Sequence, residues 1–383
     1  MKTKTTGMIL LWALAGAIPL RGTAETLNIQ GQLSGWLTAN HLKAAQGQFG
    51  LRYIPSFSLT KSLSKKVSLD AEISLNAYSS ADAPSLSDIQ TQGEIKPYRL
   101  WLRFATAQFE ARLGLQKINF GSALLLRPLM WFDRIDPNDP LQLADGVYGL
   151  LLKYTFLNNV NIWLWTLYGN DDLKGWEVIP TQEKCPELGG RFQFPLWTGE
   201  MAFSYHHRRI DPGQSLIVHS WENEKNVPEN RFGLDGKLDI GVCLWFEGVL
   251  THQDFVSSPL KYQKNINIGM DYTFAVGNGL HVLAEHLVMD TSENALNAGE
   301  TVKFSALSLD YSLGLLDRIK GMVFHNWKTG DWYRFITWQR TYDRWGFFII
   351  VFWNPEHYQI YASQSGKNFF SGRGIQVMAV FNH

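Results

Sequence analysis

The sequence predicts an all-β protein: a transmembrane, antiparallel, up-and-down β-barrel of about 18 strands, with 16 as the alternative count. Three observations lead to this fold class. Segments of alternating apolar and polar residues recur along the 383 residues, the connections between them alternate between long and short, and the chain begins with an export signal. The 35 basic and 35 acidic side chains balance, so no basic excess points to a nucleic-acid partner.

Residues 1–24 have the composition of a cleaved signal peptide. Two lysines give it a positive start, and Met8 to Leu20 form an apolar core that is too short to span a membrane comfortably. Small residues precede the predicted cleavage site after Ala24. Residues 25–383 then form the barrel, which we expect in the outer membrane of a Gram-negative cell, in contact with its lipid.

The stretch from Val67 to Ala77 shows the strand pattern most clearly. Apolar residues alternate there with polar ones such as Asp70 and Glu72, and successive strand side chains point to opposite faces. One face is therefore apolar and the other polar, over about the length that a membrane-spanning strand needs. Comparable segments predict eighteen strands, near Leu27–Thr38, Phe49–Thr60, Val67–Tyr78, Lys96–Phe104, Gln108–Gln116, Val147–Phe156, Val160–Tyr168, Gly190–Leu196, Glu200–His207, Arg231–Asp239, Gly241–Thr251, Asn265–Ala275, Gly279–Met289, Val302–Leu313, Arg318–Trp327, Trp332–Thr341, Trp345–Trp353 and Phe369–Phe381.

The connections carry an independent signal, because bacterial barrels have short periplasmic turns and longer outer loops. Taken in order, the predicted connections alternate in this way through all eighteen strands. The long ones include Ser79–Ile95, Lys117–Gly146, Gly169–Gly189, Arg208–Asn230 and Asp290–Thr301. The two cysteines, Cys185 and Cys243, fall near opposite ends of the barrel, so we expect no disulfide between them.

Aromatic residues gather near strand ends, where amphipathic rings favour a membrane interface; examples are Tyr168, Trp327 and Trp345. The last strand alternates apolar residues from Ile375 to Phe381, two residues before the end of the sequence. This pattern is similar to the C-terminal signal of outer-membrane barrels, which ends in an aromatic residue.

The connection 117–146 is the longest interruption of the strand pattern. Loops beyond about 12–15 residues are usually functional or disordered, and this one is too apolar for plain disorder. We expect it to fold into the lumen as a constriction; an outer lid and a latch between subunits are the alternatives. Its apolar residues could pack it against the wall: Leu124, Leu125, Leu126, Met130, Trp131 and Phe132.

The segment from Arg112 to Gly121, followed by Asp133 and the pairs Asp136-Pro137 and Asp139-Pro140, resembles a recurrent element of Gram-negative porin-like barrels. Among these families the alginate-export type is the nearest. The resemblance covers about thirty residues, and the rest of the chain matches in architecture. It implies passive or facilitated passage of a solute across the outer membrane.

Two groups of charged residues are the candidate site, because charged rings and ladders set the selectivity of a pore. The loop supplies the predicted pore constriction: Arg127, Asp133, Arg134, Asp136 and Asp139. Strand parity places a predicted charge ladder on the lumen side of three neighbouring strands: Asp70, Glu72, Arg99, Arg103, Glu110 and Arg112. The alternative for the ladder is that these charges only pair and brace the wall. The aspartates of the loop could also hold calcium, or form turns before the prolines.

Three function hypotheses follow. The first is a porin-like channel for small polar solutes or ions, for which a homotrimer is a common assembly. The second is a non-conducting barrel that serves as a scaffold or assembly partner, and the third is a barrel enzyme. We expect no enzyme, no metal and no cofactor, since the sequence contains no catalytic motif, and His206, His207, His281 and His286 are only weak metal candidates.

Overall fold

The structure is a computed structural model, which describes residues 25–41, 45–85, 88–214, 224–256, 258–356 and 370–383. The predicted signal peptide, residues 1–24, lies outside the described residues. Within the described part of the chain, no helix is long and apolar enough to cross a membrane. The strands are β1 (Glu25–His41), β2 (Ala45–Ser64), β3 (Val67–Ser85), β4 (Asp88–Thr106), β5 (Phe109–Gln116), β6 (Val147–Thr155), β7 (Asn161–Leu167), β8 (Glu187–Leu196), β9 (Gly199–Ile210), β10 (Val227–Asp239), β11 (Cys243–Gln253), β12 (Tyr262–Phe274), β13 (Leu280–Ser292), β14 (Glu300–Ser312), β15 (Asp317–Asn326), β16 (Trp332–Thr341), β17 (Trp345–Trp353) and β18 (Arg373–Asn382), with one short 3-10 helix, η1 (Pro212–Gln214), before β10.

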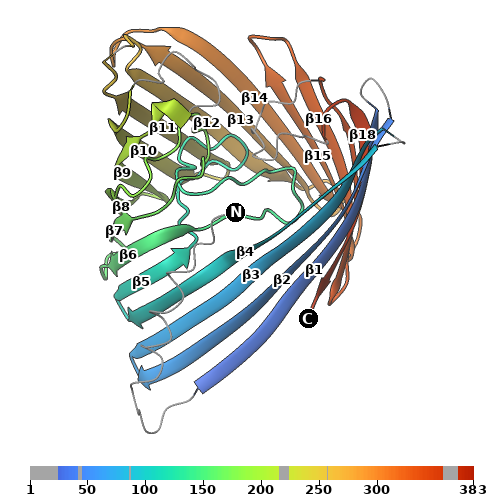
Figure 1. The fold of residues 1–383 in the computed structure, drawn as a ribbon, viewed down its shortest axis with the longest axis horizontal. Helices are drawn as coiled ribbons and strands as arrows, with labels where there is room; N and C mark the ends of the chain where they lie inside the picture. Colours follow the sequence, from blue (N-terminus) through green and yellow to red (C-terminus); the bar gives the residue numbers. More distant parts are fainter. Residues whose placement is uncertain (1–24, 42–44, 86–87, 215–223, 257, 357–369) are drawn as a thin grey trace.

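These eighteen strands form one closed antiparallel barrel (Figure 1). Each strand pairs with the next along the chain, and β18 returns to pair with β1, from Gln32 opposite Asn382 to His41 opposite Arg373. The last residue completes this seam, because the backbone N–H of His383 donates to the Gly31 carbonyl at 3.0 Å and the Gly31 N–H donates to the His383 carbonyl at 2.9 Å. The predicted fold class and strand count are confirmed.

Strand parity separates the two faces of the wall as predicted. On β3, Ile73 is 54% exposed and points outward, whereas Asp70 is 7% exposed and points into the barrel. Both ends of the barrel carry exposed aromatic rings on the outside, as an interface requires. At the end with the long connections, hereafter the loop end, they include Tyr168, Trp327 and Trp332; at the end with the short turns, hereafter the turn end, they include Tyr154, Trp197, Tyr272, Tyr342 and Trp345.

The alternation of long and short connections is confirmed from β5 onward, whereas the first two outer connections are short. The first is short because β1 ends at His41 and β2 begins at Ala45, where the prediction had Thr38 and Phe49. The segment 79–95, expected as a long loop, instead continues the strands: β3 extends to Ser85 and β4 begins at Asp88. Its alternating small and polar residues pair in register, from Ser79 opposite Gly93 to Asp82 opposite Gln90. The prediction of a loop is wrong here because small and polar side chains satisfy the strand period as well as bulky ones do.

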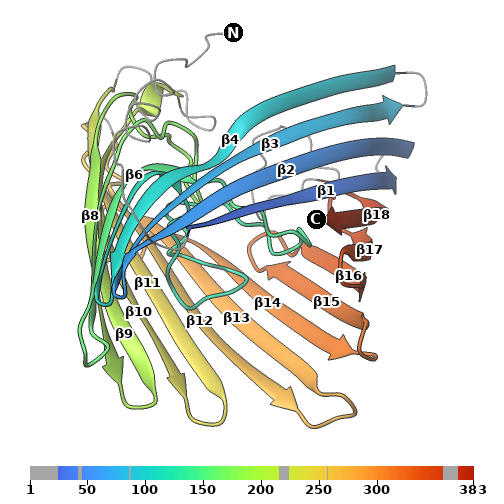
Figure 2. The same cartoon turned by 90° about the horizontal axis from the view of Figure 1, so that it is seen from below.

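The wall is uneven as a result. β4 pairs with β5 only between Leu100 and Ala105, so its first part continues beyond the end of β5. Figure 2 shows β1 to β4 projecting past the neighbouring strands. The end of the 117–146 loop lies beside this exposed stretch, because the Arg99 guanidinium donates to the Ala144 carbonyl at 2.9 Å and Lys96 pairs with Asp145 at 3.1 Å.

The two cysteines are free, as expected. This allows a direct test of barrel closure by engineered cross-linking in a background with both replaced by serine. Ala39 and Ile375 are opposite each other across the β1–β18 seam. We predict that Ala39→Cys with Ile375→Cys forms a disulfide on oxidation, seen as a mobility shift on a denaturing gel, because opposed residues lie within disulfide reach.

The matched control is Ala39→Cys with Val377→Cys, since Val377 lies opposite Leu37, two residues away. Diagonal neighbours are about 7–8 Å apart, beyond the usual disulfide geometry. Equal cross-linking of the two pairs, or none in either, would contradict this register.

Candidate functional site

The 117–146 loop crosses the inside of the barrel rather than covering its rim. Its apolar side chains complete two buried clusters with the inner wall. One cluster joins Leu125, Leu126 and Met130 to β11 and β13–β17, and the other joins Phe120, Leu129, Trp131 and Phe132 to β6, β7 and β11. Five of the six apolar residues named from the sequence are buried, and Leu124 is 54% exposed.

A buried carboxylate on β13 holds the loop backbone. Glu285 accepts hydrogen bonds from the backbone N–H groups of Leu124 at 2.6 Å, Leu125 at 3.2 Å and Leu126 at 2.5 Å. The side-chain amide of Asn267, on β12, donates to the Leu126 carbonyl at 2.8 Å and to Glu285 at 3.3 Å. The negative charge of Glu285 is thus met by successive backbone donors instead of a basic side chain.

A second carboxylate, Glu247 on β11, holds the loop backbone just before and just after the stretch that Glu285 binds. It accepts from the backbone N–H of Ala123 at 2.7 Å and from that of Leu129 at 3.1 Å, and its side chain is fully buried. Gly121 makes the close approach possible: it has a φ of 95°, and a Cβ there would lie 2.3 Å from a Glu247 oxygen. We call Glu247 and Glu285, with the five loop N–H groups at Ala123 to Leu126 and Leu129, the carboxylate clamp.

The clamp fixes how deep the loop reaches. Glu247 is four residues from the turn end of β11, and Glu285 is five residues from the turn end of β13. At about 3.3 Å per residue these positions lie roughly 13–17 Å along their strands from the turn end. The loop backbone therefore passes near the middle of the barrel.

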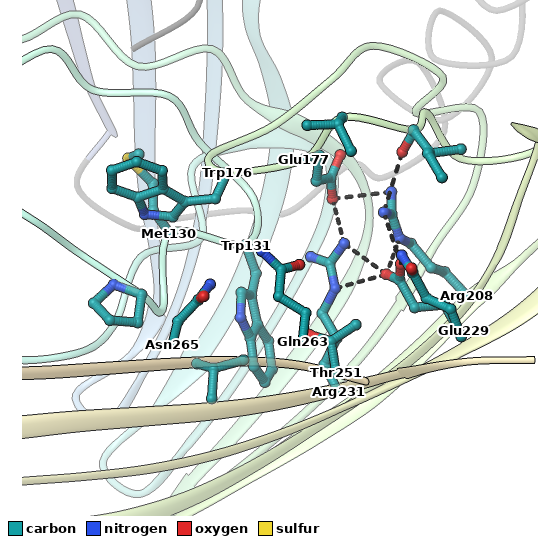
Figure 3. A pocket seen from close by; sticks show the side chains of 15 residues that line it. Met130, Trp131, Trp176, Glu177, Arg208, Glu229, Arg231, Thr251, Gln263 and Asn265 are labelled. Atoms are coloured by element: carbon teal, nitrogen blue, oxygen red, sulfur yellow. Dashed lines mark hydrogen bonds and ion pairs between the residues drawn. The ribbon is translucent and has the colours of Figure 1, made fainter. Parts of the chain in front are cut away.

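A second long connection, residues 168–186, packs onto the first. The Gly175 N–H donates to the Asp133 carbonyl at 2.8 Å, and the Trp176 indole N–H donates to the Arg127 carbonyl at 2.8 Å. This second loop is tied to the wall through a buried network of two arginines and two glutamates, which Figure 3 shows beside a pocket of the lumen.

In that network, Arg208 contacts Glu177 at 2.9 Å and Glu229 at 2.6 Å, and Arg231 contacts the same two carboxylates at 2.8 and 2.7 Å. Glu177 comes from the 168–186 loop, and the other three come from β9 and β10. Two positive and two negative charges cancel, so the network braces the loop without leaving a net charge.

Histidine 206, a weak metal candidate in the sequence, is a buried structural residue. Its Nδ1 accepts from the Trp165 indole at 3.1 Å, and its Nε2 lies 3.1 Å from Glu187. The rings of Trp131 and Phe132 pack against it. Among the described residues, no group of three or more histidine, cysteine, aspartate or glutamate side chains is placed to hold a metal.

The predicted constriction residues divide into two groups. Arg127 and Asp133 are both buried inside the loop, 3.5 Å apart, and Arg127 also donates to the Asn119 side chain. Burial raises the pKa of Asp133, and the neighbouring Arg127 guanidinium partly opposes this. Arg134 is half-buried, and desolvation lowers its pKa.

The other two aspartates cap turns of the loop. Asp136 accepts from the backbone N–H of Asn138 at 2.8 Å, and Asp139 accepts from that of Leu141 at 2.9 Å. These contacts match the turn alternative that the Asp-Pro pairs suggest, and they occupy oxygens that calcium would need. Burial raises the pKa of Asp136 to about 6 and also raises that of Asp139.

The predicted charge ladder is a continuous chain on the inner wall. Asp70 on β3 pairs with Arg103 on β4 at 2.8 Å, Arg103 lies 3.6 Å from Glu110 on β5, and Glu110 pairs with Arg112 at 2.9 Å. The Arg103 side chain is 32% exposed, so the chain of charges faces solvent inside the barrel. Of the six predicted members, Glu72 is outside this chain of ion pairs and accepts a hydrogen bond from the Ser56 hydroxyl at 3.0 Å.

The sixth member, Arg99, binds the loop end at Ala144 as described above. The structure adds Lys153 on β6, whose ammonium lies 3.7 Å from the centre of the Trp163 ring. The Arg112 guanidinium lies similarly over Trp101, at 4.8 Å. Such contacts hold a cation in place without neutralising it.

Sequence reasoning missed the clamp residues. Both glutamates lie on the lumen-facing parity of strands whose other residues are mostly apolar, in LWFEGVL for Glu247 and VLAEHLV for Glu285. A single carboxylate in such a strand needs a buried partner, and that requirement is the signal that could have identified them. Their partners are backbone N–H groups of a distant loop, which have no residue-type signature.

No protein-family model matches this chain, and no curated protein matches it. Solved structures match it over nearly its whole length. They include OccD3 (OpdP) of Pseudomonas aeruginosa, with a TM-score of 0.59, 11% identity and coverage of 94% of this chain and 92% of that one; OccAB4 of Acinetobacter baumannii, with a TM-score of 0.56, 8% identity and coverage of 96% and 100%; and OmpT, an outer membrane protein of Vibrio cholerae, in a trimer form, with a TM-score of 0.52, 12% identity and coverage of 94% and 100%.

At these identities the likeness is one of fold. The chain has the architecture of a Gram-negative outer-membrane porin-like β-barrel, which confirms the resemblance proposed from the sequence at the level of fold.

The carboxylate clamp predicts a large effect of Glu285→Ala. The substitution leaves the N–H groups of Leu124 to Leu126 without their acceptor inside the barrel. We expect the free energy of unfolding to fall by about 3 kcal/mol, and hydrogen exchange at these three amides to accelerate. Urea titration in lipid vesicles and exchange mass spectrometry measure the two quantities.

Glu72→Ala is the matched control, because Glu72 is an inner-wall glutamate that accepts from a single side chain. Its effect on unfolding should stay within about 1 kcal/mol. If the two variants have the same stability and the same exchange in the loop, the clamp does not hold the loop.

The raised pKa of Asp136 predicts a pH dependence. The ordinary pKa of this carboxyl is 3.8 and its pKa in the folded state is about 6. Between these two pH values the folded state therefore retains a proton that the unfolded state releases. The resulting stabilisation is complete below about pH 4 and is lost as the pH rises through about 6. Asp136→Asn keeps an acceptor oxygen and removes the charge. It should be more stable than the parent at pH 7.5 and no more stable at pH 4, measured as the difference between their urea midpoints.

Proposed function

We propose that this chain is an outer-membrane porin-like channel, in which small polar solutes or ions pass by passive or facilitated diffusion. Residues 1–24 are removed on export, and residues 25–383 form the barrel. The 117–146 loop is the constriction of the channel. No catalytic step is part of this proposal.

The observation that carries the proposal is the position of the clamped loop. It packs its apolar side on the inner wall of β11 and β13–β17 and leaves the charged wall of β3–β5 on another side of the lumen. A solute that follows the charged wall meets alternating acidic and basic side chains in partly solvent-exposed positions. Paired charges of both signs suit polar solutes more than a strongly charged polymer.

Within the constriction, the contributions of the five predicted residues differ. Arg134 is half-buried and adds a positive charge to the constriction, whereas Arg127 and Asp133 act as an internal pair that shapes the loop. We propose that Asp136 and Asp139 hold the loop turns and add negative potential where the pH exceeds the pKa of each. The ladder side chains then supply the opposite surface of the passage.

The matched structures support the architecture of this proposal. One of them is described as the trimer form of an outer membrane protein. We propose a homotrimer for this chain as well, surrounded by outer-membrane lipid.

A sealed barrel that serves as a scaffold is the second candidate. The observation in its favour is the apolar filling of the lumen, where the loop buries Leu125, Leu126 and Met130 against one part of the wall and Trp131 and Phe132 against another. A sealed barrel and a narrowed channel make opposite predictions for ion conductance.

The test is single-channel recording of the refolded mature chain in a planar bilayer, beside a variant that lacks Leu124 to Leu141. A channel predicts stepwise conductance in the parent, and an increase on the order of twofold in the variant, since the obstruction is removed. A variant lacking residues 294–297, in the loop between β13 and β14, is the control and should conduct like the parent.

Silence of both proteins, with normal heat-modifiable folding on a gel, would show that the barrel is sealed and would favour the scaffold. Equal conductance in the parent and the loop variant would mean that the channel exists but that this loop does not narrow it.

A further inference from the structure

An open pocket of about 360 Å³ lies at the turn end of the barrel, far from the lumen site. It is formed by two neighbouring turns, residues 313–316 between β14 and β15 and residues 342–344 between β16 and β17. Its lining consists of Leu316, Tyr342, Asp343, Arg344 and Trp345. The lining combines apolar, aromatic, acidic and basic groups in one small surface site.

The aromatic walls of the pocket belong to the outer, lipid-facing side of the barrel. Trp345 is 45% exposed and stacks with Phe347, with ring centres 5.9 Å apart, and its ring lies 4.8 Å from that of Phe381. Tyr342 is 44% exposed and meets Phe347 edge-on at 6.2 Å. Tryptophan and tyrosine at a barrel rim mark the depth of the lipid headgroups.

Two opposite charges occupy the tight turn that closes this pocket. The N–H of Tyr342 donates to the Trp345 carbonyl at 2.7 Å, which leaves Asp343 and Arg344 at the tip. Both are exposed, and neither forms an ion pair with any residue in the described ranges. A third charge is adjacent: the Arg340 guanidinium lies 5.5 Å from the Tyr342 ring centre and 3.7 Å from Asp317.

We propose that this pocket binds the headgroup of a zwitterionic phospholipid, phosphatidylethanolamine. The phosphate lies against Arg344, the ammonium donates to Asp343, and the rings of Tyr342 and Trp345 pack on the glycerol region. Adjacent charges of opposite sign match a headgroup whose phosphate and amine are two carbons apart. A primary ammonium donates hydrogen bonds to a carboxylate, which the trimethylammonium of a choline headgroup does not do.

The site is independent of the proposed channel, because none of its residues contacts the lumen groups described above. The site would hold one lipid at a fixed place around the barrel, on the side of β15–β18. It requires only that this rim lies in the headgroup region of a membrane.

The test is native mass spectrometry of the folded mature chain, released from nanodiscs that contain equal parts of phosphatidylethanolamine, phosphatidylcholine and phosphatidylglycerol with the same acyl chains. The parent should retain phosphatidylethanolamine in preference to the other two. Arg344→Gln should reduce this retention by about tenfold, because a hydrogen bond to a charged group is lost. Asp343→Asn should remove the preference over phosphatidylcholine while retaining some lipid.

Lys66→Gln is the matched control, since it removes one exposed positive charge from another turn at the same end of the barrel. It should retain lipid like the parent. All variants are compared by heat-modifiable mobility, so that only folded barrels are scored. Equal retention of the three lipids by the parent, unchanged retention in Arg344→Gln, or an equal loss in Lys66→Gln would overturn the proposal. Preference for phosphatidylglycerol would also overturn it, because that result would show an anion site without a role for Asp343.

Discussion

The carboxylate clamp is the interaction on which the interior of this barrel depends. A loop of thirty residues loses much conformational freedom when it is confined inside a lumen, and its backbone polar groups lose water. Glu247 and Glu285 offset these losses by accepting hydrogen bonds from the loop backbone at Ala123 to Leu126 and at Leu129. A buried carboxylate that accepts hydrogen bonds from several N–H groups needs no basic side chain as a partner. Because the donors belong to particular loop residues, these hydrogen bonds hold the loop in one position.

Once the loop is fixed, the lumen has two distinct sides. The inner wall of β13–β17 is apolar where the loop covers it, although an exposed barrel interior would normally be polar. The wall of β3–β5 is charged and stays accessible beside the loop. The second loop reinforces this division, because Glu177 joins it to Arg208 and Arg231 on the wall. The apolar inner faces of β11 and β13–β17 are thus explained by the loop that packs against them.

The sequence predicted the elements that depend on local patterns. Strand parity identified Asp70, Arg103, Glu110 and Arg112 as lumen neighbours, and the structure brings these four together. The predicted loop 79–95 is wrong, because its small residues form paired strands and strand pairing needs alternation and backbone donors more than bulky side chains. The clamp was beyond such reasoning because its donors are backbone groups more than 100 positions away, and backbone groups are the same in every residue type. The burial of Arg127 with Asp133 likewise depends on how the loop folds on itself.

The central claim, that the loop is held at mid-depth in the lumen, is tested most directly by a spin-label distance. Labels on Leu124, which is exposed in the lumen, and on Val276, in the turn before β13, report the depth of the loop. Because Glu285 lies five residues along β13 from the turn end, a clamped loop predicts a distance of about 20–25 Å. A loop that lies outside the rim would be beyond the full length of β13, so a distance above about 40 Å would contradict the account.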